Sequence, residues 1–257
     1  MIRIGTSGFS YRDWEQVFYP KGLPARDRLS FYAREFDTVE VNYSYYAIPT
    51  ASTLVAMARK TPADFVFAIK ANKGMTHERE DNADIFERFV EALDPWVEDG
   101  RLGCVLAQFP TSFHNTPANR DYLRVFRERM GTLPTVIEFR HREWITQNVF
   151  ALLRDLGLGF CCVDQPQLKT LMPPIAVATS DVTYVRFHGR NYQKWWRHKE
   201  AWERYDYSYE ESELAPWVPR IKGLAEESRQ TFVYANNHWQ GQAVDTARQL
   251  RLLLGLA

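Results

Sequence analysis

The chain has 257 residues, and its 32 Lys and Arg residues balance 32 Asp and Glu residues, so the formal net charge is zero. This balance argues against indiscriminate binding of nucleic acid or anionic membranes, which requires a strong positive excess, although it leaves room for a local basic cleft. The length suits one large α/β domain or two small ones. Aromatic residues make up 14% of the chain, which suits either a well-packed core or a pocket that stacks on rings or sugars.

The three cysteines and the N-terminus indicate a reducing, aqueous compartment. Cys104, Cys161 and Cys162 lie in apolar strand-like runs without metal-ligand spacing, so we expect small apolar thiols. The N-terminal run MIRIGTSGF lacks the charged and apolar regions of a signal peptide, and no apolar run approaches transmembrane length. We therefore expect a cytoplasmic protein with no membrane partner. The sequence leaves the oligomeric state open.

Strand-like and helix-like patterns alternate along the chain. Strands are predicted at about residues 2–6, 38–43, 65–70, 102–108, 134–140, 158–163, 182–188 and 231–235. Helical periodicity lies between or after them, over residues 26–36, 82–96, 119–130, 145–157 and 243–256. Eight strands alternating with helices predict a single (β/α)8 TIM-like barrel domain over residues 1–257. An open doubly wound sheet is the alternative, but the GTSGFS turn after the first strand leads into YRDW rather than an obvious helix.

Two connections depart from this alternation. The sixth unit, residues 165–181, contains three prolines and no helical period, so we expect it to be irregular. Residues 189–209, after the seventh strand, form the longest non-helical stretch and combine several Trp and Tyr residues with several cations. A connection of this length is typical of a lid or binding loop, and its composition would suit a base or a phosphorylated ligand. An aromatic hairpin that only closes the barrel is the equally supported alternative.

Nine runs of residues, taken in order, resemble one known family. They are IGTSGFSYRDW (4–14), FYP (18–20), FYAREFDTVEVNYSYYAIP (31–49), KANKGMTH (70–77), LAQFPTSF (106–113), IEFRHREW (137–144), VDQP (163–166), YVRFHGRNYQKWW (184–196) and YANNHWQGQAVDTA (234–247). Together they resemble the YecE-like family, also known as domain of unknown function 72, over essentially the whole chain. The resemblance implies a TIM-like barrel and no particular activity, and links to endonuclease IV-like barrels are analogies of fold.

Polar side chains gather at the C-terminal ends of the predicted strands. Three strands end in polar pairs two positions apart, which are Glu40 with Asn42, Glu138 with Arg140, and Arg186 with His188. Side chains at i and i+2 share one face of a strand, and the strand ends of a parallel barrel surround its active-site mouth. We expect them to converge there with Lys70, Gln108, Asp164 and Asn236, with His77 in an adjoining loop and Tyr11 and Trp14 at the rim. The alternative is an internal ion-pair network, with Glu138 on Arg140 or Arg186 and Asp164 on Lys70.

Catalytic roles are predicted from neighbours within each strand. Glu138 lies beside Arg140, so its pKa is expected to be low, whereas burial is expected to raise the pKa of Glu40. We therefore predict Glu40 as general base or acid with His188 as its proton partner, and Glu138 and Asp164 as orienting groups. Lys70, Arg140 and Arg186 are predicted to bind a phosphate or carboxylate. Further ligand contacts are expected from Asn42, His77, Gln108, Asn236, Tyr11 and Trp14.

The predicted function follows from this polar mouth. A small anionic ligand, phosphorylated or sugar-like, is expected to bind and to be converted by acid–base chemistry of hydrolase or isomerase type. A nucleic-acid-binding protein or nuclease is one alternative, and a non-catalytic small-molecule sensor is another. Glu138, Asp164, His188 and Glu40 also offer ligands for a divalent metal. Because Arg140 and Arg186 would repel such an ion, no cofactor is predicted.

Overall fold

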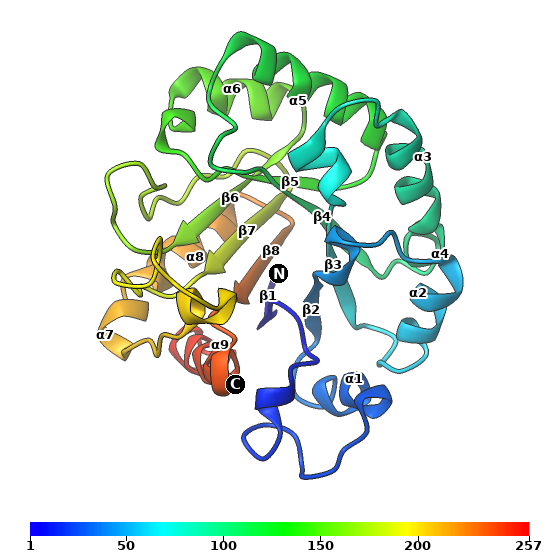
Figure 1. Ribbon diagram of the computed structural model, residues 1–257, viewed down its shortest axis with the longest axis vertical. Coiled ribbons are helices and arrows are strands. Elements are labelled where there is room, and N and C mark those ends of the chain that lie inside the picture. Colours follow the sequence, from blue (N-terminus) through cyan, green and yellow to red (C-terminus); the bar gives the residue numbers. More distant parts are fainter. Residues whose placement is uncertain (257) are drawn as a thin grey trace.

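Eight parallel strands are the framework of the computed structural model, which describes residues 1–256 (Figure 1). The strands are β1 (Ile2–Thr6), β2 (Thr38–Val41), β3 (Val66–Lys70), β4 (Leu102–Gln108), β5 (Thr135–Glu138), β6 (Gly159–Asp164), β7 (Val182–Phe187) and β8 (Gln230–Ala235). Each lies within a few residues of its predicted position.

The strands close almost completely upon themselves. Hydrogen-bonded neighbours follow the order β1-β8-β7-β6-β5-β4-β3-β2, and every pair is parallel. β1 meets β2 through a parallel bridge between Ser7 and Glu40, beside which the Gly8 N–H donates to the Glu40 carbonyl at 2.8 Å. The predicted TIM-like (β/α)8 barrel is confirmed, and the open doubly wound sheet is excluded.

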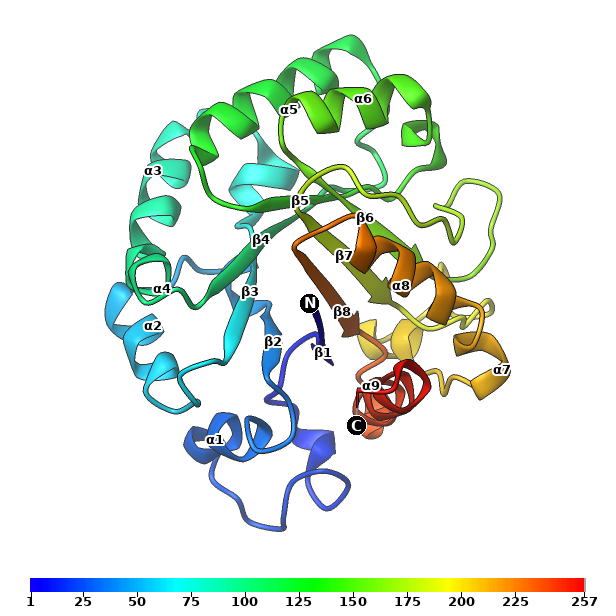
Figure 2. The same cartoon turned by 180° about the vertical axis from the view of Figure 1, so that it is seen from behind.

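Helices surround the strands, as the two opposite views show (Figures 1 and 2). They are α1 (Arg28–Tyr32), α2 (Ala51–Ala58), α3 (Ala83–Ala92), α4 (Asp94–Glu98), α5 (Pro117–Met130), α6 (Gln147–Asp155), α7 (Glu211–Leu214), α8 (Trp217–Glu226) and α9 (Gln242–Leu254). Helix α1 is shorter than the predicted segment 26–36. Among residues 1–256 no helix is both long and apolar enough to cross a membrane.

Helix α5 shows how local sequence sets these elements. The Thr116 hydroxyl accepts a hydrogen bond from the Asn119 N–H at 3.2 Å, which satisfies one of the unpaired donors of the first turn. Leu123, Phe126 and Met130 follow at helical spacing and are fully buried. The same pattern recurs at α6, where the Thr146 hydroxyl accepts from the Val149 N–H.

The apolar residues between the polar pairs of β2, β5 and β7 form the core outside the strands. All six are buried, namely Val39, Val41, Ile137, Phe139, Val185 and Phe187. Because adjacent side chains of a strand point to opposite faces, this packing directs the alternate polar residues into the barrel. The strand parity inferred from the sequence is therefore correct for these three strands.

The two irregular connections lie where the sequence places them. Residues 165–181 contain no helix and join β6 directly to β7. Residues 189–209 contain one short 3-10 helix, Ala201–Tyr205, in which Glu200 and Glu203 form a reciprocal capping box. This segment, drawn in yellow in Figure 1, lies over the C-terminal ends of the strands.

Candidate functional site

A buried ion-pair network fills the barrel just below its mouth. Arg186 on β7 donates from Nη2 to Glu40 Oε1 at 2.8 Å and from Nη1 to Glu138 Oε2 at 2.6 Å. Tyr184, two residues earlier on the same face, donates its hydroxyl to Glu40 Oε2 at 2.7 Å. Both carboxylates are fully buried. Arg186 therefore bridges β2 and β5 across the barrel.

His188 is held in one tautomer by this network. Asn236 Nδ2 donates to His188 Nδ1 at 2.9 Å, and the opposite ring nitrogen, Nε2, lies 3.1 Å from Glu138 Oε1. Since an amide N–H can only donate, the proton of the neutral ring is assigned to Nε2, which donates to Glu138. Burial and the nearby Arg140 lower the pKa of His188 to about 3, so the ring is neutral at physiological pH.

Neither buried carboxylate has the pKa of a base that works near neutral pH. Burial alone would raise the pKa of Glu138, but Arg140, Arg186 and His188 hold it well below its ordinary range. Burial would likewise raise the pKa of Glu40, but Arg186 and hydrogen bonds led by Tyr184 lower it. The expected raised pKa of Glu40 is therefore wrong, because its partners come from another strand.

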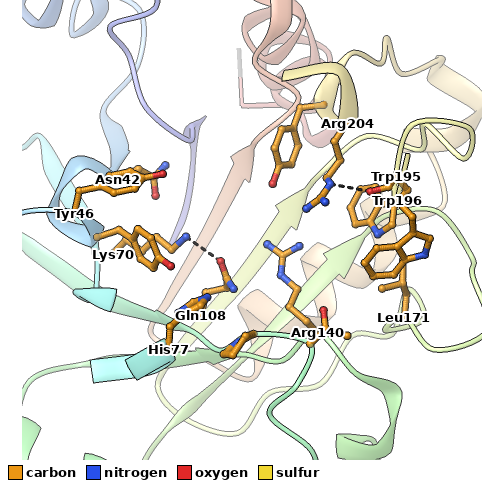
Figure 3. Close-up of a pocket in the computed structure, with 14 residues that line it drawn as sticks. Asn42, Tyr46, Lys70, His77, Gln108, Arg140, Leu171, Trp195, Trp196 and Arg204 are labelled. Atoms are coloured by element: carbon orange, nitrogen blue, oxygen red, sulfur yellow. Dashed lines mark hydrogen bonds between the residues drawn. The ribbon is translucent and has the colours of Figure 1, made fainter. Parts of the chain in front are cut away.

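An open pocket of ≈460 Å³ lies above this network (Figure 3). Its lining combines aromatic rings, three basic groups, one imidazole and neutral polar side chains: Asn42, Tyr45, Tyr46, Lys70, His77, Gln108, Pro110, Thr111, Arg140, Leu171, Trp195, Trp196, Arg204 and Tyr205. Among residues 1–256, no carboxylate belongs to this lining. The residues come from the ends of β2 to β5 and from the two irregular connections.

Two guanidinium groups point toward each other across the pocket (Figure 3). Arg140 Nε lies 2.7 Å from Glu138 Oε1 as an ion pair, without the alignment of a hydrogen bond. Arg204 donates from Nε to the Trp195 carbonyl at 3.0 Å, and its guanidinium lies over the Trp195 ring. Within residues 1–256, Arg204 has no carboxylate within 4.0 Å.

Lys70 enters the pocket from the end of β3. Its Nζ donates to Gln108 Oε1 at 2.9 Å and lies 4.6 Å from the centre of the Tyr45 ring. Burial, with Arg186 and Arg140 nearby, lowers its pKa from 10.5 to about 7. His77 lines the same pocket, and burial together with Lys70 and Arg140 lowers its pKa to about 4. The pocket thus holds an amine that titrates near neutrality beside a neutral imidazole.

Asp164 lies outside the barrel mouth, which corrects its predicted place in the site. Its carboxylate accepts two hydrogen bonds from Arg190, at 2.8 and 2.7 Å, and one each from Tyr209 and Trp217, both at 2.7 Å. Trp217 belongs to α8 on the outside of the barrel. The predicted pairing of Asp164 with Lys70 is therefore wrong, and Arg190 is committed to Asp164 and Glu213.

Tyr11 and Trp14 are packed beside the mouth rather than exposed on its rim. Trp14 is fully buried and donates from its indole nitrogen to the His238 carbonyl at 2.7 Å. Tyr11 donates its hydroxyl to the Ser7 carbonyl at 2.6 Å and stacks on the His238 ring. Neither residue lines the pocket, so both act as anchors of the loop after β1.

The structure divides the other predicted residues into two layers. Asn42, Lys70, His77, Gln108 and Arg140 line the pocket. Glu40, Glu138, Arg186, His188 and Asn236 are buried beneath it. Arg186, predicted to contact the ligand, is therefore a supporting residue whose charge is neutralised by Glu40 and Glu138.

Several residues of the pocket were not predicted from the sequence, above all Arg204, Tyr205 and the pair Tyr45 and Tyr46. Arg204 lies in the connection identified as a binding loop, but nothing in its neighbours distinguishes it from the other cations there. Tyr184 was detectable, because it stands two positions before Arg186 and must share its face.

The metal site considered from Glu138, Asp164 and His188 is not assembled, since Asp164 lies outside and arginines occupy the carboxylates. Within the described part of the chain, three potential metal ligands meet on the rim instead: His114, His141 and Glu143, with ligand atoms within 4.8 Å of one another. Glu143 Oε2 lies 3.0 Å from His114 Nδ1 and 3.5 Å from His141 Nδ1. The contact between His114 and Glu143 is accounted for as a simple hydrogen bond.

Comparison with known proteins gives a family for this arrangement. The family model described as "Protein of unknown function DUF72" matches residues 3–257. The chain belongs to the DUF72 family. The resemblance drawn from its motifs is thereby confirmed, because YecE-like is another name for the same family.

Relatives of this DUF72 protein match over nearly their whole length. UPF0759 protein YunF of Bacillus subtilis (strain 168) is 32% identical, and the match covers 100% of this chain and 95% of YunF. The crystal structure of a DUF72 family protein (TM1631) from Thermotoga maritima MSB8 is 38% identical, with a TM-score of 0.92 and 99% of each chain covered. A second, EF0366 from Enterococcus faecalis V583, is 26% identical with a TM-score of 0.89, over 100% of this chain and 96% of that one.

Proposed function

We propose that this DUF72 barrel binds a small organic anion, carrying a phosphate or a carboxylate, in the pocket at its mouth. One observation carries the proposal. The buried carboxylates Glu40 and Glu138 are matched by Arg186 and Arg140, whereas Lys70 and Arg204 have no carboxylate within 4.0 Å among residues 1–256. A pocket with cations and no opposing charge attracts an anion, and desolvation of its walls strengthens that attraction.

The two guanidinium groups suit the anionic end of the ligand. Arg140 is fixed by Glu138 and Arg204 by the Trp195 carbonyl, so each presents its remaining N–H groups in a set direction. Planar donors held in this way bind two oxygens of one phosphate or carboxylate. Lys70 adds a third positive charge when it is protonated.

The remainder of the lining suits the organic part of such a ligand. Tyr45, Trp196 and Tyr205 offer ring faces, which pack against sugars or flat rings. Asn42 also lines the pocket and contributes a neutral amide beside these rings. The volume of ≈460 Å³ suits a small metabolite rather than a polymer.

For conversion of the ligand, we assign proton transfer to Lys70 rather than to Glu40 and His188. The pKa of Lys70, about 7, is matched to neutral pH, whereas His188 is lowered to about 3 and Glu40 lies below its ordinary range. Glu40 and Glu138 then act as positioning residues: both hold Arg186 beneath the pocket, and Glu138 also holds Arg140 in the pocket wall.

Ligand-induced stabilisation tests the proposal. Sulfate, phosphate and sugar phosphates should raise the melting temperature of the native chain, and Arg204→Met should remove most of that rise. Arg197→Met is the matched control, because Arg197 belongs to the same loop and is exposed outside the pocket. Equal stabilisation of the native chain and the Arg204→Met variant would place the anion elsewhere. Turnover of a stabilising compound would separate an enzyme from a sensor.

Binding of nucleic acid is a second candidate, favoured by the exposed rings at the rim. Tyr46 is 77% and Trp196 52% exposed, and stacked bases prefer such ring faces. Binding to the phosphate backbone would weaken steeply with salt. A shift assay with single- and double-stranded oligonucleotides at two salt concentrations distinguishes this candidate from a small-anion pocket.

A further inference from the structure

Lys70 differs from the ion-paired lysines nearby in its partners. Lys73, three residues along the chain, lies 2.6 Å from Glu78 Oε1, and Lys194 lies 2.6 Å from Glu203 Oε2. Lys70 has only the neutral Gln108 oxygen and the face of Tyr45, with no carboxylate within 4.0 Å in the described chain. A largely buried ammonium group without a paired carboxylate is costly, so this environment requires an explanation.

This environment favours the neutral form of the Lys70 amine. At pH 7.5 a group with a pKa of about 7 is roughly three quarters neutral, whereas an ordinary lysine is neutral in roughly one molecule in a thousand. The neutral amine carries the lone pair that attacks carbonyl carbon. Gln108 Oε1 accepts from Nζ and therefore holds the side chain in the pocket without neutralising it.

We infer that Lys70 forms an imine with a small aldehyde or ketone whose phosphate or carboxylate is held by Arg140 and Arg204. This inference rests on the proposed anion pocket and names its ligand class more closely. The amine nitrogen of Lys70 adds to the carbonyl carbon, and the resulting carbinolamine loses its hydroxyl as water. The C=O bond is replaced by C=N, one water is released, and no oxidant or reductant is needed.

The arrangement in Figure 3 places the groups for this step around one space. Arg140 and Arg204 approach from the β5 side and from the loop over the mouth, and Lys70 enters from β3 with its Nζ directed toward Gln108. An anion bound by the arginines holds the carbonyl in the same pocket as the amine, which raises its effective concentration there. His77 lines the same pocket as a neutral imidazole, and the Lys70 charge helps to lower its pKa.

Reductive trapping tests the inference. The native chain is incubated at pH 7.5 with dihydroxyacetone phosphate, pyruvate or acetone, and borohydride is then added. We expect one adduct per chain with at least one of the two anionic probes, at the mass of the probe less one oxygen atom, and peptide mapping should place it on Lys70. Acetone at the same concentration should give little, because it lacks the anionic group.

Matched variants separate this inference from the function on which it rests. Lys70→Arg keeps the cation and should keep sulfate stabilisation while losing the adduct, and Lys73→Arg should keep both. Melting curves confirm that each variant is folded. Sulfate stabilisation without any Lys70 adduct would overturn the imine and leave the anion pocket standing. Adducts spread over surface lysines would overturn it too, and loss of both signals would remove the pocket and the imine together.

Discussion

Replacing Lys70 by methionine should make the protein more stable at pH 6, although it removes a hydrogen bond. Lys70 has a pKa of about 7 in the folded chain, against an ordinary value of 10.5. Between these values the unfolded chain binds more protons than the folded one, so the free energy of unfolding of the native protein rises with pH. Below about pH 7 the folded protein carries the full penalty of a protonated Lys70, and above about pH 10.5 it carries none.

The size of this penalty follows from the same two values. At about 1.4 kcal/mol for each pKa unit, a fall from 10.5 to about 7 corresponds to about 5 kcal/mol as an upper limit. Lys70 reaches an open pocket, so about half of this is the more reasonable figure. Methionine also loses the bond to Gln108 and the contact with the Tyr45 ring, together about 1–2 kcal/mol. We expect Lys70→Met to be about 0.5–1.5 kcal/mol more stable at pH 6, and this gain to reverse into a loss of about 1–2 kcal/mol as the pH approaches 10.5.

Urea unfolding of both chains at intervals from pH 6 to pH 9.5 measures this difference. Lys222→Met, at an exposed position of α8, is the control and should follow the native protein at every pH. A Lys70→Met variant that is less stable than the native chain at pH 6, or whose difference does not change with pH, would refute the reasoning. It would mean that Lys70 meets a counter-charge that the structure does not show.

Three further predictions follow from the same contacts. Asp164→Asn should lower the free energy of unfolding, measured in urea, by about 3–5 kcal/mol, because Arg190, Tyr209 and Trp217 lose a shared carboxylate. It should leave the stabilisation by sulfate unchanged. Loss of that stabilisation would mean that Asp164 does contribute to the anion site. Glu138→Gln should lower the free energy of unfolding by a similar amount, because Arg186 and Arg140 share that carboxylate. An unchanged urea midpoint would show that these ion pairs do not stabilise the fold. Sulfate affinity, measured by calorimetry, should fall as pH rises through 7 while Lys70 loses its proton, and a flat profile would show that Lys70 does not contact the anion.

Strand parity explains how much of this site was predictable from sequence. Glu40, Glu138, Arg186 and His188 were expected to face inward because apolar residues alternate with them, and all four are buried inside the barrel. Alternation could not predict the direction of the Asp164 side chain, because its strand GFCCVD is apolar almost throughout and shows no alternating pattern. There the outward direction depends on Tyr209 and Trp217, which lie more than forty residues away in sequence.

The pKa of Glu40 shows a different limit of sequence reasoning. Neighbours on one strand are visible in a sequence, and they predicted the low pKa of Glu138 correctly. Glu40 is paired across the barrel with Arg186 and Tyr184 of β7, and this pairing depends on which strands face each other at the same height. Arg204 was not predicted as a pocket residue for a related reason, because the conformation of its loop decides which of the loop's cations points into the pocket.

Charge in the barrel mouth is therefore arranged in two layers with different properties. In the lower layer, Glu40 and Glu138 pair with Arg186 at 2.8 and 2.6 Å, and this arginine helps to lower the pKa of both carboxylates, which therefore stay ionised at neutral pH. In the upper layer, Lys70 contacts the neutral side chains of Gln108 and Tyr45, so its charge depends on pH and on the ligand that enters the pocket. An entering anion would raise the pKa of Lys70, whereas an entering carbonyl would meet its neutral form. Because the carboxylates of the lower layer are held by Arg186, neither is free to pair with Lys70. A mobile carboxylate beside Lys70 would pair with it and raise its pKa away from neutrality.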